Sequence, residues 1–220
     1  YDLREWKKAN PEGLIVSYVN TTAATKSLTD VVVTSSNACQ IVESFPKDTP
    51  IIFGPDQNLG GYINSITGRN MLLWNGACHV HEKFSVEKIA RLKREHPGAK
   101  VLAHPECKGP VAKIADKVGS TAALLKFSIS DPAKEFIVAT ESGILHEMQK
   151  SAPHKTFIPA PPDDSTCACN ECNFMKLITL HKLYNCLKYE WPTIEVDPEI
   201  AEKAVRPINK MLEISKKLGL

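Results

Sequence analysis

The sequence lacks any apolar run that approaches the roughly 18 residues of a membrane-spanning helix, and no charged, apolar and small-residue leader opens it. It also has little net charge, since 27 Lys and Arg stand against 25 Asp and Glu and the basic residues are scattered. No basic face therefore indicates a nucleic-acid partner. These absences favour a soluble protein of the cytoplasm, or of a plastid if the source is a plant, that binds neither nucleic acid nor membrane.

A glycine-rich phosphate loop is also missing, which weakens the hypothesis of a sugar-phosphate or nucleotide enzyme of the doubly wound class. The chain is long enough for a hydrophobic core, and it is rich in cysteine. Its 220 residues, of which 43% are hydrophobic, can bury a core without disulfide staples. We therefore expect free thiols or metal ligands among the seven cysteines, which are residues 39, 78, 107, 167, 169, 172 and 186.

An internal repeat organises most of the chain. Shifting the sequence by 86 residues aligns Leu3–Trp74 with Ile89–Ala160 without a gap, although few positions are identical. In each copy a charged helical pattern stops at a Pro and Gly turn, and short apolar runs typical of buried parallel strands follow, such as LIVSYVN and KVLAHPE. This alternation predicts an α/β fold of repeated small three-layer domains with parallel sheets. We expect repeats over 1–86 and 87–172, then a helical segment over 173–220.

Polar side chains follow the first two expected strands of each copy. The first strand ends in Tyr18 and Asn20 or in His104 and Glu106, and the second ends in Thr34 and Ser35 or in Ser120 and Thr121. Ligands of parallel α/β sheets bind at the carboxyl ends of the strands. Hydroxyls beside the free N–H groups of a helix start suit a phosphate or carboxylate, although helix capping alone explains either pair. Recurrence in both copies favours anion binding.

The last expected strand of each copy leads to cysteine. Cys78 follows the first in NGACHVH, and Cys167, Cys169 and Cys172 follow the second in a segment that contains CACNEC. Thiolates from two related loops that meet at one point favour zinc or iron–sulfur, and the spacing does not choose between them. A rival hypothesis is a zinc-binding or thiol-regulated module without catalysis, which uses CACNEC and CHVH as ligands.

The motifs SYVNTT, TSSNA, IFGPDQNLGGY, NGACHVH, HPEC, VGST, TESGILH and CNFMKL resemble the quinolinate synthase family in order and spacing. The resemblance implies three pseudo-threefold α/β domains around one [4Fe–4S] cluster that three cysteines hold. It also implies the condensation of iminoaspartate with dihydroxyacetone phosphate to quinolinate, for NAD biosynthesis. An aspartate-oxidising enzyme that supplies iminoaspartate is the expected protein partner.

The resemblance also assigns the thiols. Cys78 and Cys172 fall on cluster-ligand positions, whereas Cys107 of HPEC does not. Cys39 and Cys186 are expected to be ordinary buried thiols. The pair at 167 and 169 stays open between a redox pair, an alternative ligand and a spectator.

The repeat predicts where a third ligand belongs. Counting back 86 residues from Cys78 leads upstream of Tyr1, so we expect a further domain and a third cysteine before this chain, which would then be a fragment. The apolar residues of PEIAEKAVRPINKMLEISKKL recur at helical spacing, and we expect that helix to pack on the further domain.

The same resemblance assigns substrate residues. It implies that Tyr18 and Asn20 contact substrate, that Ser35, Ser120 and Thr121 contact its anionic groups, and that His81, His104 and Glu106 lie near the reacting atoms. Glu106 is our choice for proton transfer, with His104 and Tyr18 as the other catalytic residues. A surface or packing role is the commoner one for an isolated His or Glu, so these roles depend on motif order.

The chain departs from the family in one motif. Where the family reads Asn-Thr-Leu-Glu, this chain has Ile178 and His181 at the first and last positions, so we expect a helix start or an interdomain contact near the cluster to differ.

Overall fold

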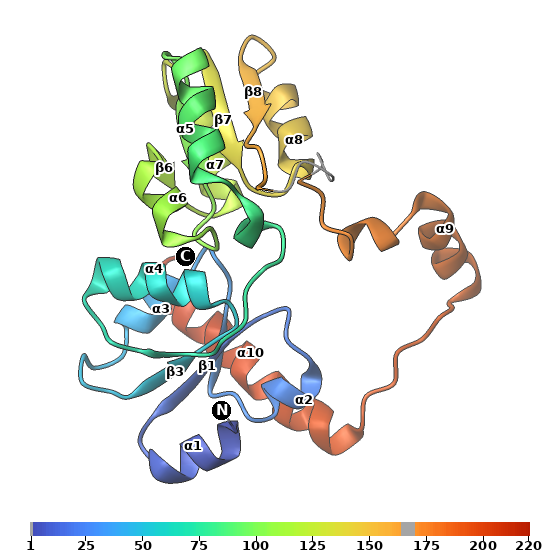
Figure 1. The fold of residues 1–220 in the computed structure, drawn as a ribbon. Helices are drawn as coiled ribbons and strands as arrows, with labels where there is room; N and C mark the ends of the chain where they lie inside the picture. Colours follow the sequence, from blue (N-terminus) through green and yellow to red (C-terminus); the bar gives the residue numbers. More distant parts are fainter. Residues whose placement is uncertain (1, 164–169) are drawn as a thin grey trace.

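Two parallel four-stranded sheets form the framework of the computed structural model, which describes residues 2–163 and 170–220 (Figure 1). The strand orders are β2-β1-β3-β4 and β6-β5-β7-β8, with every pairing parallel. The strands are β1 Leu14–Tyr18, β2 Val31–Val33, β3 Ile51–Phe53, β4 Leu72–Leu73, β5 Lys100–Ala103, β6 Lys117–Val118, β7 Glu135–Ala139 and β8 Thr156–Pro159. The predicted α/β class with parallel sheets is confirmed.

Helices connect the strands and follow them at the C-terminal end. They are α1 Leu3–Ala9, α2 Ala23–Lys26, α3 Ala38–Glu43, α4 Gln57–Thr67, α5 Val86–Glu95, α6 Gly109–Ile114, α7 Thr121–Ser130, α8 Gly143–Ser151, α9 Leu180–Tyr189 and α10 Pro198–Leu218, with 3-10 turns η1 His81–Lys83 and η2 Met175–Leu177. Short polar side chains start several of them, as when Ser85 accepts the Lys88 N–H at α5. Within the described part of the chain, no helix combines the length and the apolar character that crossing a membrane requires.

The two sheets share more than strand order. Lys7 on α1 lies 3.0 Å from Asp30, and Lys93 on α5 lies 2.8 Å from Asp116. In each sheet this aspartate also accepts the backbone N–H of the second residue of the central strand, at 2.7 Å in the first and 2.8 Å in the second. Lys7 and Lys93 are 86 residues apart, and so are Asp30 and Asp116. The shift that aligns the two copies therefore places one Lys–Asp interaction on the other.

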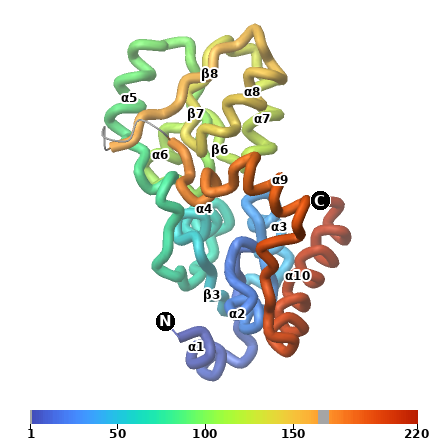
Figure 2. The backbone as a smooth tube through the Cα atoms, turned by 90° about the vertical axis from the view of Figure 1, so that its right-hand side faces the viewer, coloured from blue at the N-terminus to red at the C-terminus, as the bar shows by residue number. Residues whose placement is uncertain are grey.

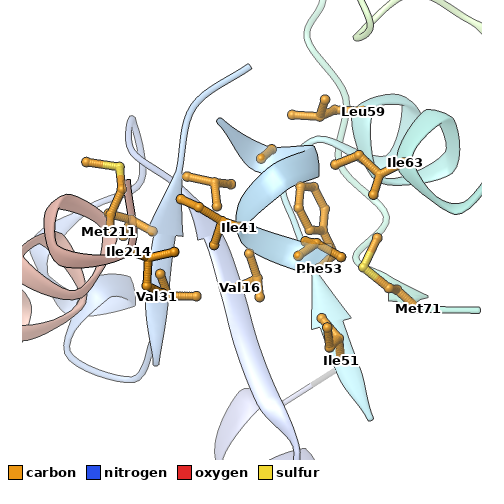
Figure 3. Packing of buried hydrophobic residues seen from close by; sticks show 14 residues of the cluster. Val16, Val31, Ile41, Ile51, Phe53, Leu59, Ile63, Met71, Met211 and Ile214 are labelled. Carbon is orange, nitrogen blue, oxygen red and sulfur yellow. The ribbon is translucent and has the colours of Figure 1, made fainter. Parts of the chain in front are cut away.

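Strands β1, β2, β3, β5 and β7 are buried on both sides over most of their length, which explains their continuous apolar runs. In the first sheet Val16, Val31 and Phe53 pack with residues of α3 and α4, and Figure 3 shows these side chains converging. The second sheet packs on two clusters, one around Leu102 and Phe136 and the other around residues of α5 and the loop before it. Each sheet thus has its own core.

Helix α10 lies against the first sheet of this chain. Packing of its other face on a preceding domain stays a prediction. Ala204, Pro207, Met211 and Ile214 are buried, and the last two belong to the core around Val31 (Figure 3). Figures 1 and 2 show α10 beside α2 and α3, along the edge that β2 forms. The helical spacing predicted the apolar face of α10. This face packs on β2, the edge strand of the first sheet.

The segment of residues 174–197, which contains η2 and α9, lies away from both cores (Figure 1). Its large apolar side chains are exposed, namely Phe174, Met175, Leu177, Ile178, Leu180, Leu183, Tyr184, Leu187, Tyr189, Trp191, Ile194 and Val196. Ile178 and His181, the two departures from the family motif, both lie here and are exposed.

Candidate active site

A cavity of about 900 Å³ lies at the carboxyl ends of the strands of both sheets. Eight of the residues selected from the sequence line it: Tyr18, Asn20, Cys78, His81, His104, Glu106, Thr121 and Cys172. Among the described residues that line this cavity, Ser35 and Ser120 do not occur. Because strand ends of both sheets face the same space, side chains far apart in the sequence share one site.

Two histidines and a glutamate form the buried centre of the cavity. His81 Nδ1 lies 3.1 Å from Glu106 Oε2, and His104 Nδ1 lies 3.9 Å from the same oxygen. The two imidazole rings stack with centroids 4.5 Å apart and planes 18° apart. The side chains are 8%, 5% and 10% exposed for His81, His104 and Glu106.

Hydrogen bonds fix both rings. His81 Nε2 lies 2.9 Å from the hydroxyl of Thr140, the residue that follows β7. The backbone N–H of Glu106 donates to Nδ1 of His104 at 3.3 Å, which places the ring proton of neutral His104 on Nε2. The Glu106 carboxylate lies off the direction in which His81 Nδ1–H would donate, so their contact is an ion pair and not a linear hydrogen bond.

The environment moves the pKa values of this centre apart. Burial lowers the pKa of His81, but contacts with Cys78 and Glu106 outweigh it and raise the value to about 9. Burial and the charge of His81 lower the pKa of His104 to about 4. Burial opposes ionisation of Glu106, yet His81 and His104 lower its pKa. Near neutral pH the centre therefore holds an imidazolium–carboxylate pair beside a neutral imidazole, a pattern typical of acid/base sites.

Tyr18 links Ser35 to this centre. Burial and the negative charge of Glu106 raise the pKa of the phenol, whereas hydrogen bonds with Ser35 oppose that rise. Ser35 thus lies near the Tyr18 hydroxyl, although it is not among the described residues that line the cavity.

The anion contact expected of Ser35 stays a prediction, and this residue precedes α3 by three positions. Helix α3 begins at Ala38 with Asn37 as its N-cap, and the Asn37 side chain accepts the backbone N–H of Thr34 at 2.7 Å. Ser120 does cap α7, where it accepts the Ala123 N–H at 3.3 Å, and Thr121 beside it faces the cavity.

The cysteines separate into two groups. Cys78 and Cys172 are half-buried free thiols that line the cavity, one from each sheet's final loop. Cys107 is buried, donates from Sγ to the Ala139 carbonyl at 3.3 Å, and has a pKa that burial raises. Cys167 and Cys169 lie outside the described residues.

The expectation of buried thiols is wrong for the other two cysteines. Cys186 lies on exposed α9. Cys39 is half-buried, and burial together with Glu43 raises its pKa to about 11.

Thiol and imidazole atoms give the site the character of a metal centre. Cys78, His81 and Glu106 each offer one ligand atom, and these atoms lie within 4.8 Å of one another. Nε2 of His79 and Nδ1 of His81 are buried without a hydrogen-bond partner, and both side chains line the cavity. Two thiolates on one cavity fit soft metals or an iron–sulfur cluster.

Several residues that line the cavity were not selected from the sequence, and three of them contact the centre or a cysteine loop. Thr140 holds His81, His79 contacts the ring of Phe174 edge-on at 5.4 Å, and the Asp56 carboxylate accepts the Cys78 N–H at 2.6 Å. Asp56 and Thr140 both stand in quoted motifs, just after the third strand of their sheets. Strand-end position was therefore a signal that could have found them.

Comparison with known proteins decides the family. The family model described as NadA, quinolinate synthetase A protein, matches residues 1–213. This chain belongs to that family. Quinolinate synthases of Synechococcus sp. and Chloroherpeton thalassium are each 52% identical to it, over 96% and 97% of the chain and 66% of each relative. The quinolinate synthase of Nostoc punctiforme is 54% identical over 96% of the chain and 64% of the relative. The chain thus spans just under two thirds of the length of these relatives.

Proposed function

We propose that the natural full-length protein is a quinolinate synthase that condenses iminoaspartate with dihydroxyacetone phosphate. The observation that carries this proposal is the placement of Cys78, Cys172 and the His81–Glu106–His104 centre on one cavity between the two sheets. Family membership supports it, since relatives at about half identity bear that enzyme's name.

We further propose that the cofactor is a [4Fe–4S] cluster. Cys78 and Cys172 would be two of its ligands, and the third would come from a further domain of the pseudo-threefold arrangement. With three thiolates, such a cluster supplies an iron with an open position that acts as a Lewis acid on a substrate oxygen or carboxylate. The donor set fits this group because both cysteines are free and face the same cavity.

The chain's own residues would bind substrate and move protons. Neutral His104 carries a proton on Nε2 and can donate a hydrogen bond from it to a substrate oxygen. The Glu106–His81 pair can exchange a proton with substrate, because the carboxylate and the imidazolium are in contact and both line the cavity. The Tyr18 phenol stays protonated and can donate, since its pKa is raised. Asn20 and Thr121 at the exposed part of the cavity would contact the phosphate or carboxylate groups.

The domain assignment follows from the same proposal. Residues 1–86 and 87–172 would each supply one α/β unit and one cluster loop, and residues 173–220 would form a helical segment. A protein partner that oxidises aspartate would supply iminoaspartate to this cavity.

Anaerobic purification of the full-length protein tests the function. We expect bound iron and sulfide, a brown colour, and quinolinate formed from iminoaspartate and dihydroxyacetone phosphate. Bound zinc, without iron and without quinolinate formation, would instead support the zinc-binding or thiol-regulated module and overturn the proposal.

A further inference from the structure

We propose that Asp56 and Glu141 are positioning residues that hold the two ligand cysteines through their backbone N–H groups. Each stands just after the third strand of its sheet, next to the loop that follows the fourth. The inference rests on the proposed cluster, because it concerns how Cys78 and Cys172 are presented to it.

Asp56 uses its two carboxylate oxygens for different purposes. Oδ1 accepts the N–H groups of Asn58 at 2.7 Å and Leu59 at 3.0 Å, which caps α4. Oδ2 accepts the Cys78 N–H at 2.6 Å, across 22 residues of sequence. The residue is only 4% exposed, so little water competes for that second oxygen.

Capping alone does not account for this arrangement. One oxygen is sufficient for an N-cap, and serine serves almost as well as aspartate. Burial of the Asp56 carboxylate is costly, and its backbone N–H partners, Cys78 among them, offset that cost. The Cys78 N–H that Oδ2 accepts is not needed to cap α4. It belongs to the backbone of a cluster loop.

Glu141 repeats the pattern in the second sheet. Its Oε2 accepts the N–H of Gly143, two residues on and the first residue of α8, at 2.8 Å. Its Oε1 lies 3.4 Å from the Cys172 N–H. The neighbouring Ser142 N–H donates to the Asn170 carbonyl at 3.0 Å, which docks the same loop. The contact to Cys172 is longer than its counterpart, so Glu141 is expected to be the weaker anchor.

The recurrence supports a common role. In both sheets an acidic side chain accepts the N–H two residues on with one oxygen and contacts a ligand cysteine with the other. Groups that orient metal ligands in this way commonly contribute roughly 10- to 100-fold to metal affinity. We expect their loss to appear first as a cluster that dissociates faster.

The test separates the two oxygens of Asp56 in the full-length protein. Asp56→Ser keeps a capping hydroxyl and removes the acceptor for Cys78. Asp56→Asn keeps the shape and one oxygen for the cap, and it turns an amide N–H₂ group toward the Cys78 N–H. The matched control is Asp197→Ser, because Asp197 caps α10 through the N–H groups of Glu199 and Ile200 and contacts no cysteine in the described structure.

The readout is the rate at which a chelator removes iron under anaerobic conditions, together with the EPR spectrum of the reduced cluster. Asp56→Ser and Asp56→Asn should lose iron roughly 10- to 100-fold faster than the unchanged protein, with an altered spectrum. Asp197→Ser should behave like the unchanged protein, and Glu141→Gln should show a smaller change. After iron removal, Asp56→Ser and Asp197→Ser should melt at similar temperatures.

Two results would overturn the inference in different ways. If the unchanged protein binds no iron, the proposed function fails and the inference fails with it. If the unchanged protein binds the cluster and Asp56→Asn loses iron no faster, Asp56 only caps α4 and the proposed function stands.

Discussion

Glu106 bears a negative charge in a place where burial disfavours it. Its side chain is 10% exposed, and the two neighbouring imidazoles keep its pKa low. The contact with Glu106 favours protonation of His81. His104 lies against His81, and burial together with the charge of His81 keeps His104 neutral. Two histidines in opposite protonation states are a useful arrangement for a site that both donates and accepts protons.

Replacing Glu106 by glutamine should separate proton transfer from binding. The amide keeps the shape but can neither carry the charge nor take a proton, so quinolinate formation should fall by roughly 10²-fold or more. The cluster colour and the binding of a dicarboxylate product analogue should persist. The exposed Glu95→Gln is the control, and near-normal turnover of Glu106→Gln would move the acid/base role to His104.

Removing the hydroxyl of Ser120 or of Thr121 at the start of α7 should have opposite effects on stability and on substrate binding. Ser120→Ala removes an N-cap and should cost about 1 kcal/mol of unfolding free energy, with unaltered apparent KM. Thr121→Ala should leave the melting temperature unchanged. It should raise the apparent KM roughly 5- to 30-fold, the equivalent of about 1 to 2 kcal/mol for a hydrogen bond to a charged group.

Thermal unfolding and steady-state kinetics on the same samples decide between the two roles. If Thr121→Ala changes stability and not KM, this residue is no anion contact and the cavity binds its phosphate or carboxylate elsewhere.

Strand-end position explains which site residues the sequence could predict. Tyr18, His104 and Glu106 follow apolar runs, and their side chains do meet in one cavity. Ser35 follows such a run too, yet it lies in a turn that Asn37 closes on Thr34 and is not among the described residues that line the cavity. A side-chain contact that closes a turn has no periodic signature in sequence, so its effect on Ser35 became visible only in the structure.

At the scale of elements, one Lys–Asp contact recurs in both sheets and joins the first helix to the central strand. In the second sheet, partial burial opposes ionisation of Asp116. The hydrogen bonds from Lys93 and from the Val101 N–H outweigh that effect and lower its pKa. A lowered carboxyl pKa means that the folded state binds the proton more weakly than the unfolded state does.

Asp116→Asn should therefore destabilise the protein in a pH-dependent way. The stability that the ionised carboxylate contributes is present above the unfolded pKa of about 4 and is lost as the pH falls through the lower folded value. The side chain is partly exposed, so the difference from the unchanged protein should be no more than about 1 kcal/mol at pH 7.

Urea unfolding at pH 7 and near pH 3 measures this difference, with exposed Asp48→Asn as the control. A difference that grows toward acid would contradict the assigned direction of the shift.

At the scale of the whole molecule, patterns predicted the sheets better than the way the helices pack on them. Parallel strands such as β1 and β7 are recognisable because both of their faces are buried. Helix α10 has a recognisable apolar face, but nothing in that spacing says whether it covers β2 or another domain. The exposure of α9 was equally unpredictable, since its apolar residues resemble those of a buried helix.

Joining the two sheets at one cavity has a consequence for cluster binding. Each sheet contributes one of the cavity's free cysteines, so neither unit alone can hold a cluster that needs both.

In the full-length protein purified without oxygen, Cys78→Ser and Cys172→Ser should each abolish the brown iron–sulfur chromophore, because a hydroxyl is a poor substitute for a soft thiolate ligand. Cys107→Ser and Cys39→Ser should keep it, since Cys107 bonds to the Ala139 carbonyl in the core and Cys39 contacts Glu43 on α3. Iron and sulfide content per chain is the measurement, and unchanged iron in both Cys78→Ser and Cys172→Ser would show that the cluster is held by other residues.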